Sequence, residues 1–162
     1  MSNYTTYKPS SSDPSTKDIV QMQVTRLQNT SAHISTSTTS RLYSGLEVNI
    51  TPRFQDSTLM IKCTSNMTYG RTGTKLMWSL YRTIDGSGAY SVYDTRSGEN
   101  YYGWSYASYN AWAAYSTVWY EQPNTTSQVN YKVYYNEFTS STVAYFCHRA
   151  MDCFLQVMEI KA

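Results

Sequence analysis

Large apolar side chains recur at every second residue in several short stretches of this chain. The sharpest stretch runs from Val129 to Tyr135, where Val and Tyr occupy the alternate positions. A period of two residues is what a β-strand with one buried face requires. Strands are predicted at residues 18–28, 46–50, 59–63, 76–80, a segment ending near 120, and at 129–135, 143–147 and 154–160.

Turn signals separate these stretches. Pro52 ends one alternating run, "DGSG" follows another at residues 85–88, and Pro123 and Asn124 separate two more. Residues 29–41 are predicted as a loop or a sparse strand. The only helical signal is a short alanine-containing segment at residues 109–115. Short strands with Gly, Pro and Asn between them predict an all-β, antiparallel sandwich or barrel.

The two ends of the chain differ from the middle. Residues 1–17 are rich in Ser, Thr and Pro and lack apolar periodicity, which predicts an extended N-terminal arm. The remaining residues, 18–162, fit one domain of ordinary size.

The last predicted strand carries apolar residues on both of its faces. Leu155 and Val157 share one face, and the other face holds Phe154, Met158 and Ile160. Such a strand is expected to be buried on both sides. Because a small antiparallel sandwich covers only one face of a sheet, we expect another copy of the chain to cover the second. These five residues are therefore the predicted interface between copies of the chain.

The composition narrows the class of protein. Charged residues make up only 15% of the chain, the net charge is +2, and there are 17 tyrosines. The few basic residues are scattered, so no nucleic-acid footprint is expected. The N-terminus lacks the apolar segment of a signal peptide, which predicts synthesis in the cytoplasm. The uncharged run at residues 104–120 is too polar to insert into a membrane.

The three cysteines, Cys63, Cys147 and Cys153, are an odd number. This favours reduced thiols over a disulfide framework. A bridge between Cys147 and Cys153 stays open as the alternative.

Catalytic and metal-binding patterns are weak. No G-x-S-x-G, H-E-x-x-H or phosphate-binding loop occurs. Asp85 and Asp94 are candidates for a glycosidase pair, but aspartates are common in turns, which is the favoured interpretation. Cys147, His148 and Cys153 have an unusual spacing for zinc. We therefore predict a protein that is not an enzyme and needs no metal or cofactor.

Four segments in order resemble the small jelly-roll domains of tailed-phage virions. They are "VQMQV" at 20–24, "LEVNITPRFQDSTLMIKC" at 46–63, "QPNTTSQVNYKVYY" at 122–135 and "LQVMEI" at 155–160. The resemblance implies an antiparallel jelly roll similar to the tumour-necrosis-factor and C1q folds. It also implies a homotrimer around a threefold axis. The chain departs from this family in its central loop, which is longer and more aromatic.

The resemblance leads to two functional hypotheses for a bacteriophage virion protein. The first is a capsid decoration, or cement, protein: a trimeric knob on the head whose arms reach onto the major capsid protein. The short chain without a shaft favours it. The arm residues expected to dock on the capsid are Tyr4, Tyr7, Lys8 and Pro9.

The second hypothesis is the receptor-binding tip of a tail fibre. Its support is an aromatic loop interleaved with Ser, Gly and Asn, a composition that resembles antibody paratopes and suits a host surface polysaccharide. The alternative is that these rings pack across the trimer contact. The candidate ligand residues are Tyr90, Tyr93, Tyr101, Tyr102, Trp104, Tyr106, Tyr109 and Trp112.

Overall fold

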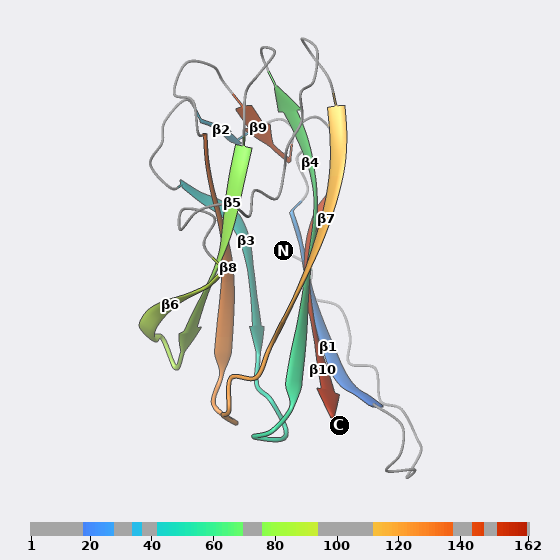
Figure 1. Ribbon diagram of the computed structural model, residues 1–162, viewed down its shortest axis with the longest axis vertical. Coiled ribbons are helices and arrows are strands. Elements are labelled where there is room, and N and C mark those ends of the chain that lie inside the picture. The colour runs from blue at the N-terminus through green and yellow to red at the C-terminus, as the bar shows by residue number, and fades with distance from the viewer. Residues whose placement is uncertain are drawn as a thin grey trace.

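Two antiparallel β-sheets face each other in the structure, a computed structural model (Figure 1). It describes residues 18–27, 34–36, 42–69, 76–93, 112–137, 144–147 and 152–161. The strands are β1 (Asp18–Leu27), β2 (Ile34–Thr36), β3 (Leu42–Ile50), β4 (Thr58–Tyr69), β5 (Leu76–Ile84), β6 (Ser87–Tyr93), β7 (Trp112–Glu121), β8 (Val129–Glu137), β9 (Ala144–Phe146) and β10 (Cys153–Lys161).

The strand order is that of a jelly roll. Sheet A places β1, β10, β4 and β7 side by side, and sheet B places β3, β8, β5 and β6 side by side. Counted along the chain, the eight long strands therefore follow the order 1-8-3-6 in sheet A and 2-7-4-5 in sheet B. Successive strands mostly cross from one sheet to the other, which is the double Greek-key connection of a jelly roll. The predicted all-β antiparallel sandwich is confirmed.

The short strands β2 and β9 extend sheet A at one end (Figure 1). Strand β10 pairs with β4 up to Thr64, and β9 pairs with β4 again from Met67 to Tyr69. Only two residues of β4 lie between these pairings, whereas residues 147–152 separate β9 from β10. These residues form the β9–β10 loop of the chain.

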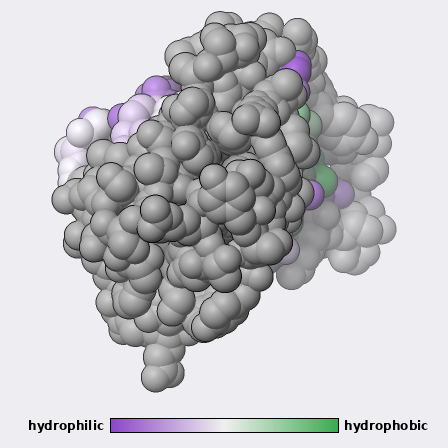
Figure 2. All heavy atoms as spheres, turned by 90° about the horizontal axis from the view of Figure 1, so that it is seen from above, coloured by the Kyte–Doolittle hydropathy of each residue, from purple (hydrophilic) through white to green (hydrophobic). Residues whose placement is uncertain are grey.

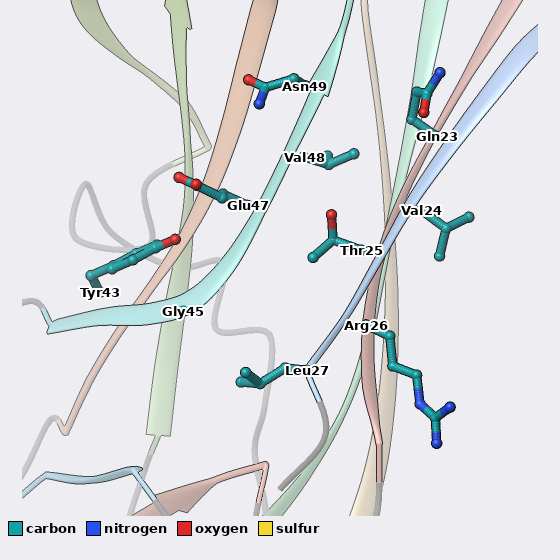
Figure 3. A pocket seen from close by; sticks show the side chains of 10 residues that line it. All are labelled: Gln23, Val24, Thr25, Arg26, Leu27, Tyr43, Gly45, Glu47, Val48 and Asn49. Atoms are coloured by element: carbon teal, nitrogen blue, oxygen red, sulfur yellow. The ribbon is translucent and has the colours of Figure 1, made fainter. Parts of the chain in front are cut away.

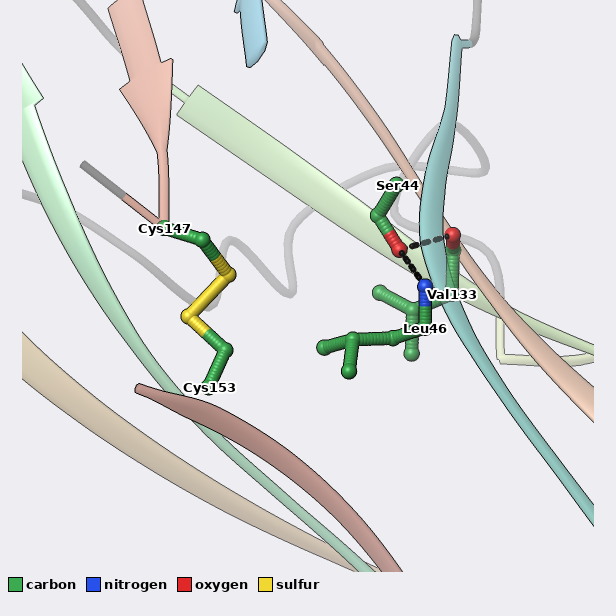
Figure 4. Close-up of a disulfide and its surroundings, with 5 residues drawn as sticks. All are labelled: Ser44, Leu46, Val133, Cys147 and Cys153. Carbon is green, nitrogen blue, oxygen red and sulfur yellow. Dashed lines mark hydrogen bonds between the residues drawn. A yellow bond between two sulfur atoms is a disulfide. The ribbon is translucent and has the colours of Figure 1, made fainter. Parts of the chain in front are cut away.

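A disulfide between Cys147 and Cys153 closes this loop (Figure 4), with the two Cα atoms 5.8 Å apart. The prediction of reduced thiols was wrong for these two residues, because counting cysteines says nothing about which of them the sheet register brings together. Cys63 is free and buried in β4, and burial raises the pKa of its thiol to about 12.

The region between residues 85 and 118 also differs from its prediction. Part of it forms the edge strand β6, and the segment predicted as a short helix contributes Trp112–Tyr115 to strand β7. Ten consecutive residues of β7 pair with β4. The cross-strand pairing outweighs the helix propensity of Ala113 and Ala114, which is small for any one residue.

The core lies between the two sheets. The alternation predicted for β8 is confirmed, since Val129, Tyr131, Val133 and Tyr135 are all fully buried. They pack with buried residues of the facing sheet and of β3 and β5: Leu46, Val48, Ile50, Leu59, Ile61, Cys63, Leu80, Trp119, Cys147, Cys153, Leu155 and Val157.

Strand β3, at the edge of sheet B, contains a bulge next to this core. Gly45 has a φ of +83°, a conformation that glycine adopts at little cost. The Ser44 hydroxyl donates a hydrogen bond to the Val133 carbonyl (2.6 Å) and accepts one from the Leu46 amide (3.1 Å), as Figure 4 shows. The polar groups freed by the bulge are thereby satisfied inside the protein.

A buried carboxylate joins three distant parts of the chain. Glu159 of β10 is fully buried, and its Oε1 accepts hydrogen bonds from the Arg53 amide (2.8 Å), the Phe54 amide (3.1 Å) and the Ser57 hydroxyl (2.7 Å). Its Oε2 accepts a hydrogen bond from Gln21 Nε2 (2.7 Å). The Gln21 amide also donates to the Thr51 carbonyl (2.6 Å). We call these residues the Glu159 cluster; it fixes the β3–β4 turn against β1 and β10.

A second polar group joins the two sheets at one end. Glu121, at the end of β7, accepts a hydrogen bond from the Tyr131 hydroxyl of β8 and forms an ion pair with Arg82 of β5 (3.1 Å). Burial, followed by the Glu121 charge, raises the pKa of Tyr131. The carboxylate therefore connects sheet A to two strands of sheet B.

Replacing Glu159 with Gln is expected to destabilise the fold. The Gln amide group would face a donor at one of the two oxygen positions, and a buried donor without a partner costs about 1–3 kcal/mol. Urea unfolding should show a loss of at least that size. The matched control is Glu47→Gln, which removes an exposed ion pair with Lys132 and should cost less than about 1 kcal/mol. Equal losses would contradict the role given to the Glu159 cluster.

Thiol counting tests the cysteine assignment. The native protein should not react with a disulfide reagent at pH 8, because Cys63 is buried with its pKa near 12. After unfolding without a reductant, one thiol should react, since Cys63 is the free cysteine. Three reactive thiols in the unfolded protein would show that the Cys147–Cys153 bond does not form.

Candidate functional site: the outer face of sheet A

The outer face of sheet A is apolar across all four long strands. In β10, Leu155 and Val157 point into the core, while Phe154, Met158 and Ile160 point outward. The strand register places the neighbouring residues of β1, β4 and β7 on the same side. We call this surface the outer face; its apolar members are Ile19, Met22, Val24, Met60, Val118, Tyr120, Phe154, Met158 and Ile160.

One row of this surface crosses the whole sheet. Met22 pairs with Met158, Met158 with Met60, and Met60 with Tyr120. Three methionines and one tyrosine therefore form a continuous stripe over four strands. Methionine is flexible and polarisable, and it fits irregular partner surfaces well.

Several side chains beside this stripe are exposed to solvent. Tyr120 is 64% exposed, Val118 42%, Ile19 38% and Phe154 37%. Four of the five large apolar residues that are exposed in the described part of the chain thus lie on this face. In the view from above, Figure 2 shows hydrophobic surface, with hydrophilic residues beside it, on the side of the molecule where sheet A lies. A contiguous apolar surface of this kind is typical of a protein contact.

The few charges on the outer face are positive or paired. Lys62 lies between Gln156 and Val118 in the sheet register. Arg26 forms an ion pair with Asp152. Little desolvation of charge therefore opposes the burial of this surface.

The outer face of sheet B is different. Glu47 and Lys132 form an ion pair across β3 and β8 (3.2 Å), and Asn130 donates a hydrogen bond to Asn49 (2.7 Å). Such cross-strand polar pairs are typical of a sheet surface that faces water. The outer face of sheet A is therefore the more apolar of the two outer surfaces and the candidate contact surface.

A cluster of tyrosines accompanies these polar pairs on sheet B. The ring of Tyr134 lies 5.7 Å from that of Tyr43 and 5.1 Å from that of Tyr81. Partial burial, followed by the Glu47 charge, raises the pKa of Tyr43 to about 12. Tyr43 is 43% exposed, so the cluster also presents aromatic surface.

The predicted trimer interface divides between two places. Leu155 and Val157 lie in the core of a single chain, so assigning them to an interface is corrected: the facing sheet B already covers them. Phe154, Met158 and Ile160 lie on the outer face, which sheet B does not cover. Their role in an interface stays a prediction.

The other candidate residues lie mostly outside the described residues. This holds for the arm residues Tyr4, Tyr7, Lys8 and Pro9, and for Asp94, Tyr101, Tyr102, Trp104, Tyr106, Tyr109 and His148. Tyr90 and Tyr93 lie on β6 and Trp112 begins β7, with side chains that are not described. The proposed ligand loop therefore stays a prediction.

The catalytic and metal alternatives find no site in the described part of the chain. Asp85 occupies the β5–β6 turn with a φ of +47°, as expected of a turn residue. Cys147 and Cys153 are joined to each other, which leaves no thiolate there to hold a zinc ion. Within the described ranges, no group of three His, Cys, Asp or Glu residues is placed to hold a metal, and no helix is long and apolar enough to span a membrane.

The sequence contained a signal for the missed residues of the outer face. The segment "VQMQV" has apolar residues at Val20, Met22 and Val24, and the sheet partners of Met22 and Val24 are the outward residues Met158 and Gln156 of β10. Alternation alone does not say which face of the sheet these residues occupy. Only the sheet register shows that Met22 and Val24 lie on the outer face.

Comparisons with known proteins identify no family. No protein-family model and no curated protein matches the chain. A chain from a structure of infectious bursal disease virus, Gx strain, is similar, with 8% sequence identity and a TM-score of 0.44. The match covers 96% of this chain and 45% of that chain, so this protein spans less than half of the viral one. A likeness at this level does not show function, and the proposal below depends on the geometry.

Proposed function

We propose that this protein is a structural component of a phage virion, a trimeric decoration protein on the capsid surface. The observation that carries the proposal is the outer face of sheet A, which is apolar over four strands and exposed on a single chain. A second copy is the occupant we propose for it. The resemblance of four ordered segments to phage jelly-roll domains supports a place for the protein in a phage virion.

The composition of the outer face fits a subunit contact. Protein interfaces are enriched in Met, Tyr and Phe and depleted in charge at their centre. The stripe of Met22, Met60, Met158 and Tyr120 has that composition, with Phe154 beside it. Burying apolar surface contributes about 25 cal/mol per Å2, so a contact over this face gains most of its free energy from these side chains.

The proposed mechanism of decoration is avidity. Three joined chains carry three arms, and each arm that binds raises the effective concentration of the others at the shell. Individually weak contacts by residues 1–17 then suffice to clamp neighbouring capsid positions. No catalytic group or cofactor is needed for this role.

A tail-fibre tip that recognises host polysaccharide is the second candidate. The tyrosine cluster of sheet B favours it, because exposed rings such as that of Tyr43 provide stacking surface for sugars. Imaging virions that carry a labelled copy of the protein separates the two. Label on the head supports decoration, and label on the tail supports the fibre tip.

Replacing Met158 with Asp should disrupt assembly. Met158 lies at the centre of the methionine stripe and is only partly buried in one chain, so a charge there opposes association more than folding. Sedimentation should shift from a trimer to a monomer while the circular dichroism of the β-sheets is kept. Thr83→Asp, on the outer face of sheet B, is the control and should leave the trimer intact. A wild-type protein that sediments as a monomer at all concentrations would refute the contact.

Deleting residues 1–17 should weaken binding to capsid shells without dissociating the trimer. The expected result in co-sedimentation with empty capsids is a large loss of bound protein, because each trimer loses all three arms. A trimer that binds shells equally well without its arms would contradict the proposed mechanism.

A further inference from the structure

A groove separates the two sheets along one side of the sandwich. It lies between β1 at the edge of sheet A and β3 at the edge of sheet B, and its volume is about 210 Å3. The lining residues are Gln23 to Leu27 of β1 together with Tyr43, Gly45, Glu47, Val48 and Asn49 of β3 (Figure 3). At one end the groove closes where Leu27 packs close to Gly45.

The two strands contribute differently to this groove. Figure 3 shows Thr25, Leu27 and Val48 pointing into the space between the strands, whereas Glu47 and Asn49 point away from β1. Strand β3 therefore offers mainly its backbone to the groove. From β1, the inward-facing positions of Gln23 and Thr25 supply an amide and a hydroxyl.

Both strands are edge strands. Among the described strands, β1 pairs with β10 alone and β3 with β8 alone, so one row of backbone N–H and C=O groups on each lacks a strand partner. Edge strands usually carry a proline, a charged side chain or a bulge that prevents pairing with other chains. Residues 21–27 of β1 contain no proline and no bulge, and their one charged side chain, Arg26, forms an ion pair with Asp152. An edge of this kind is a template for an added strand.

The N-terminal segment has the composition of such a strand. Residues 2–8 read Ser-Asn-Tyr-Thr-Thr-Tyr-Lys, and Pro9 follows directly. Tyr and Thr favour extended structure, and proline ends a strand. The polar side chains of this segment also suit a groove lined by an amide and a hydroxyl.

We propose that the groove between β1 and β3 receives residues 2–8 of a neighbouring copy as an added β-strand. This inference rests on the proposed function. It assumes that each arm crosses the capsid surface, and it identifies a neighbouring copy of the protein as the partner on which the arm ends. When residues 2–8 are docked, residues 9–17 remain as the linker to β1, and this linker extends to at most about 30 Å, which sets the greatest distance to the neighbouring copy. Backbone hydrogen bonds supply the affinity, and the proline limits the length of the added strand.

A synthetic peptide of residues 2–8 tests the proposal on the full-length protein. The protein carries Thr5→Pro and Thr6→Pro, which remove two successive amide donors from its own arm and so prevent it from competing. Fluorescence anisotropy should show the labelled peptide binding, with Ser-Asn-Tyr-Thr-Thr-Tyr-Lys in scrambled order as the control. Binding by the scrambled peptide as strongly as by the native order would overturn sequence-specific docking.

Backbone methylation then tests the strand geometry. One peptide is N-methylated at residues 3, 5 and 7, and the other at residues 4 and 6. In a strand added to one edge, alternate N–H groups face the partner, so one peptide should lose affinity about tenfold or more and the other should change little. Equal losses in both peptides, or no binding by the native peptide, would overturn the proposal.

The outcomes separate this proposal from the proposed function. Alternating loss of peptide affinity in a protein that does not bind shells would keep the added strand and refute the decoration role. A trimer that binds shells but not the peptide would refute only the added strand. Cross-linking gives a second measurement on the assembled protein: Thr6→Cys of one copy should form a disulfide with Thr25→Cys of another, and not with Ser87→Cys at the exposed β5–β6 turn.

Discussion

The Glu159 carboxylate is the constraint on which the arrangement of sheet A depends. A charged group without solvent is tolerated only when donors surround it, and here the donors come from the β3–β4 turn and from Gln21 of β1. Satisfying the carboxylate therefore sets the turn, the position of β1 beside β10, and the register in which β10 enters the sheet. Three of the four segments that resemble phage jelly-roll domains, at residues 20–24, 46–63 and 155–160, meet at this point. Their co-occurrence has a physical reason: each supplies part of one hydrogen-bonded cluster.

Fixing the register decides which side chains of sheet A face outward. With Glu159, Val157 and Leu155 facing inward, Met158 and its neighbours in β1, β4 and β7 must face outward. A shift by one residue would exchange the two faces and expose the carboxylate's side of the strand. The same buried group that stabilises one chain therefore determines the surface available for assembly. The outer face of sheet B differs from that of sheet A, because its strands carry an ion pair and hydrogen-bonded amide side chains there.

Much of the fold could be predicted from alternation and turn residues. Strands β8 and β10 were found with nearly correct bounds because their buried positions are large and regular, and the same holds for the strong turn at residues 85–88. The segment 109–115 was misassigned because helix propensity is local, whereas the pairing of β7 with β4 joins residues far apart in the sequence. The disulfide was missed for the same kind of reason: residues 147 and 153 meet because β9 and β10 both pair with β4, which brings their facing ends together. Leu155 and Val157 were assigned to an interface although they belong to the core, since alternation identifies two faces of a strand but cannot say which one the second sheet covers.

The loop closed by Cys147 and Cys153 gives the two ends of the sandwich unequal cohesion. Beyond it, β2 and β9 are held to the rest of sheet A by three register pairs between β9 and β4 and by the covalent bond. The opposite end is held by the Glu159 cluster and the Glu121 ion pair. Cleaving the sulfur bridge would thus release a small terminal unit able to open on its own, while the eight long strands stay together. The molecule is therefore a sandwich of eight long strands with one end that can open separately. Redox conditions determine whether the disulfide holds that end in place.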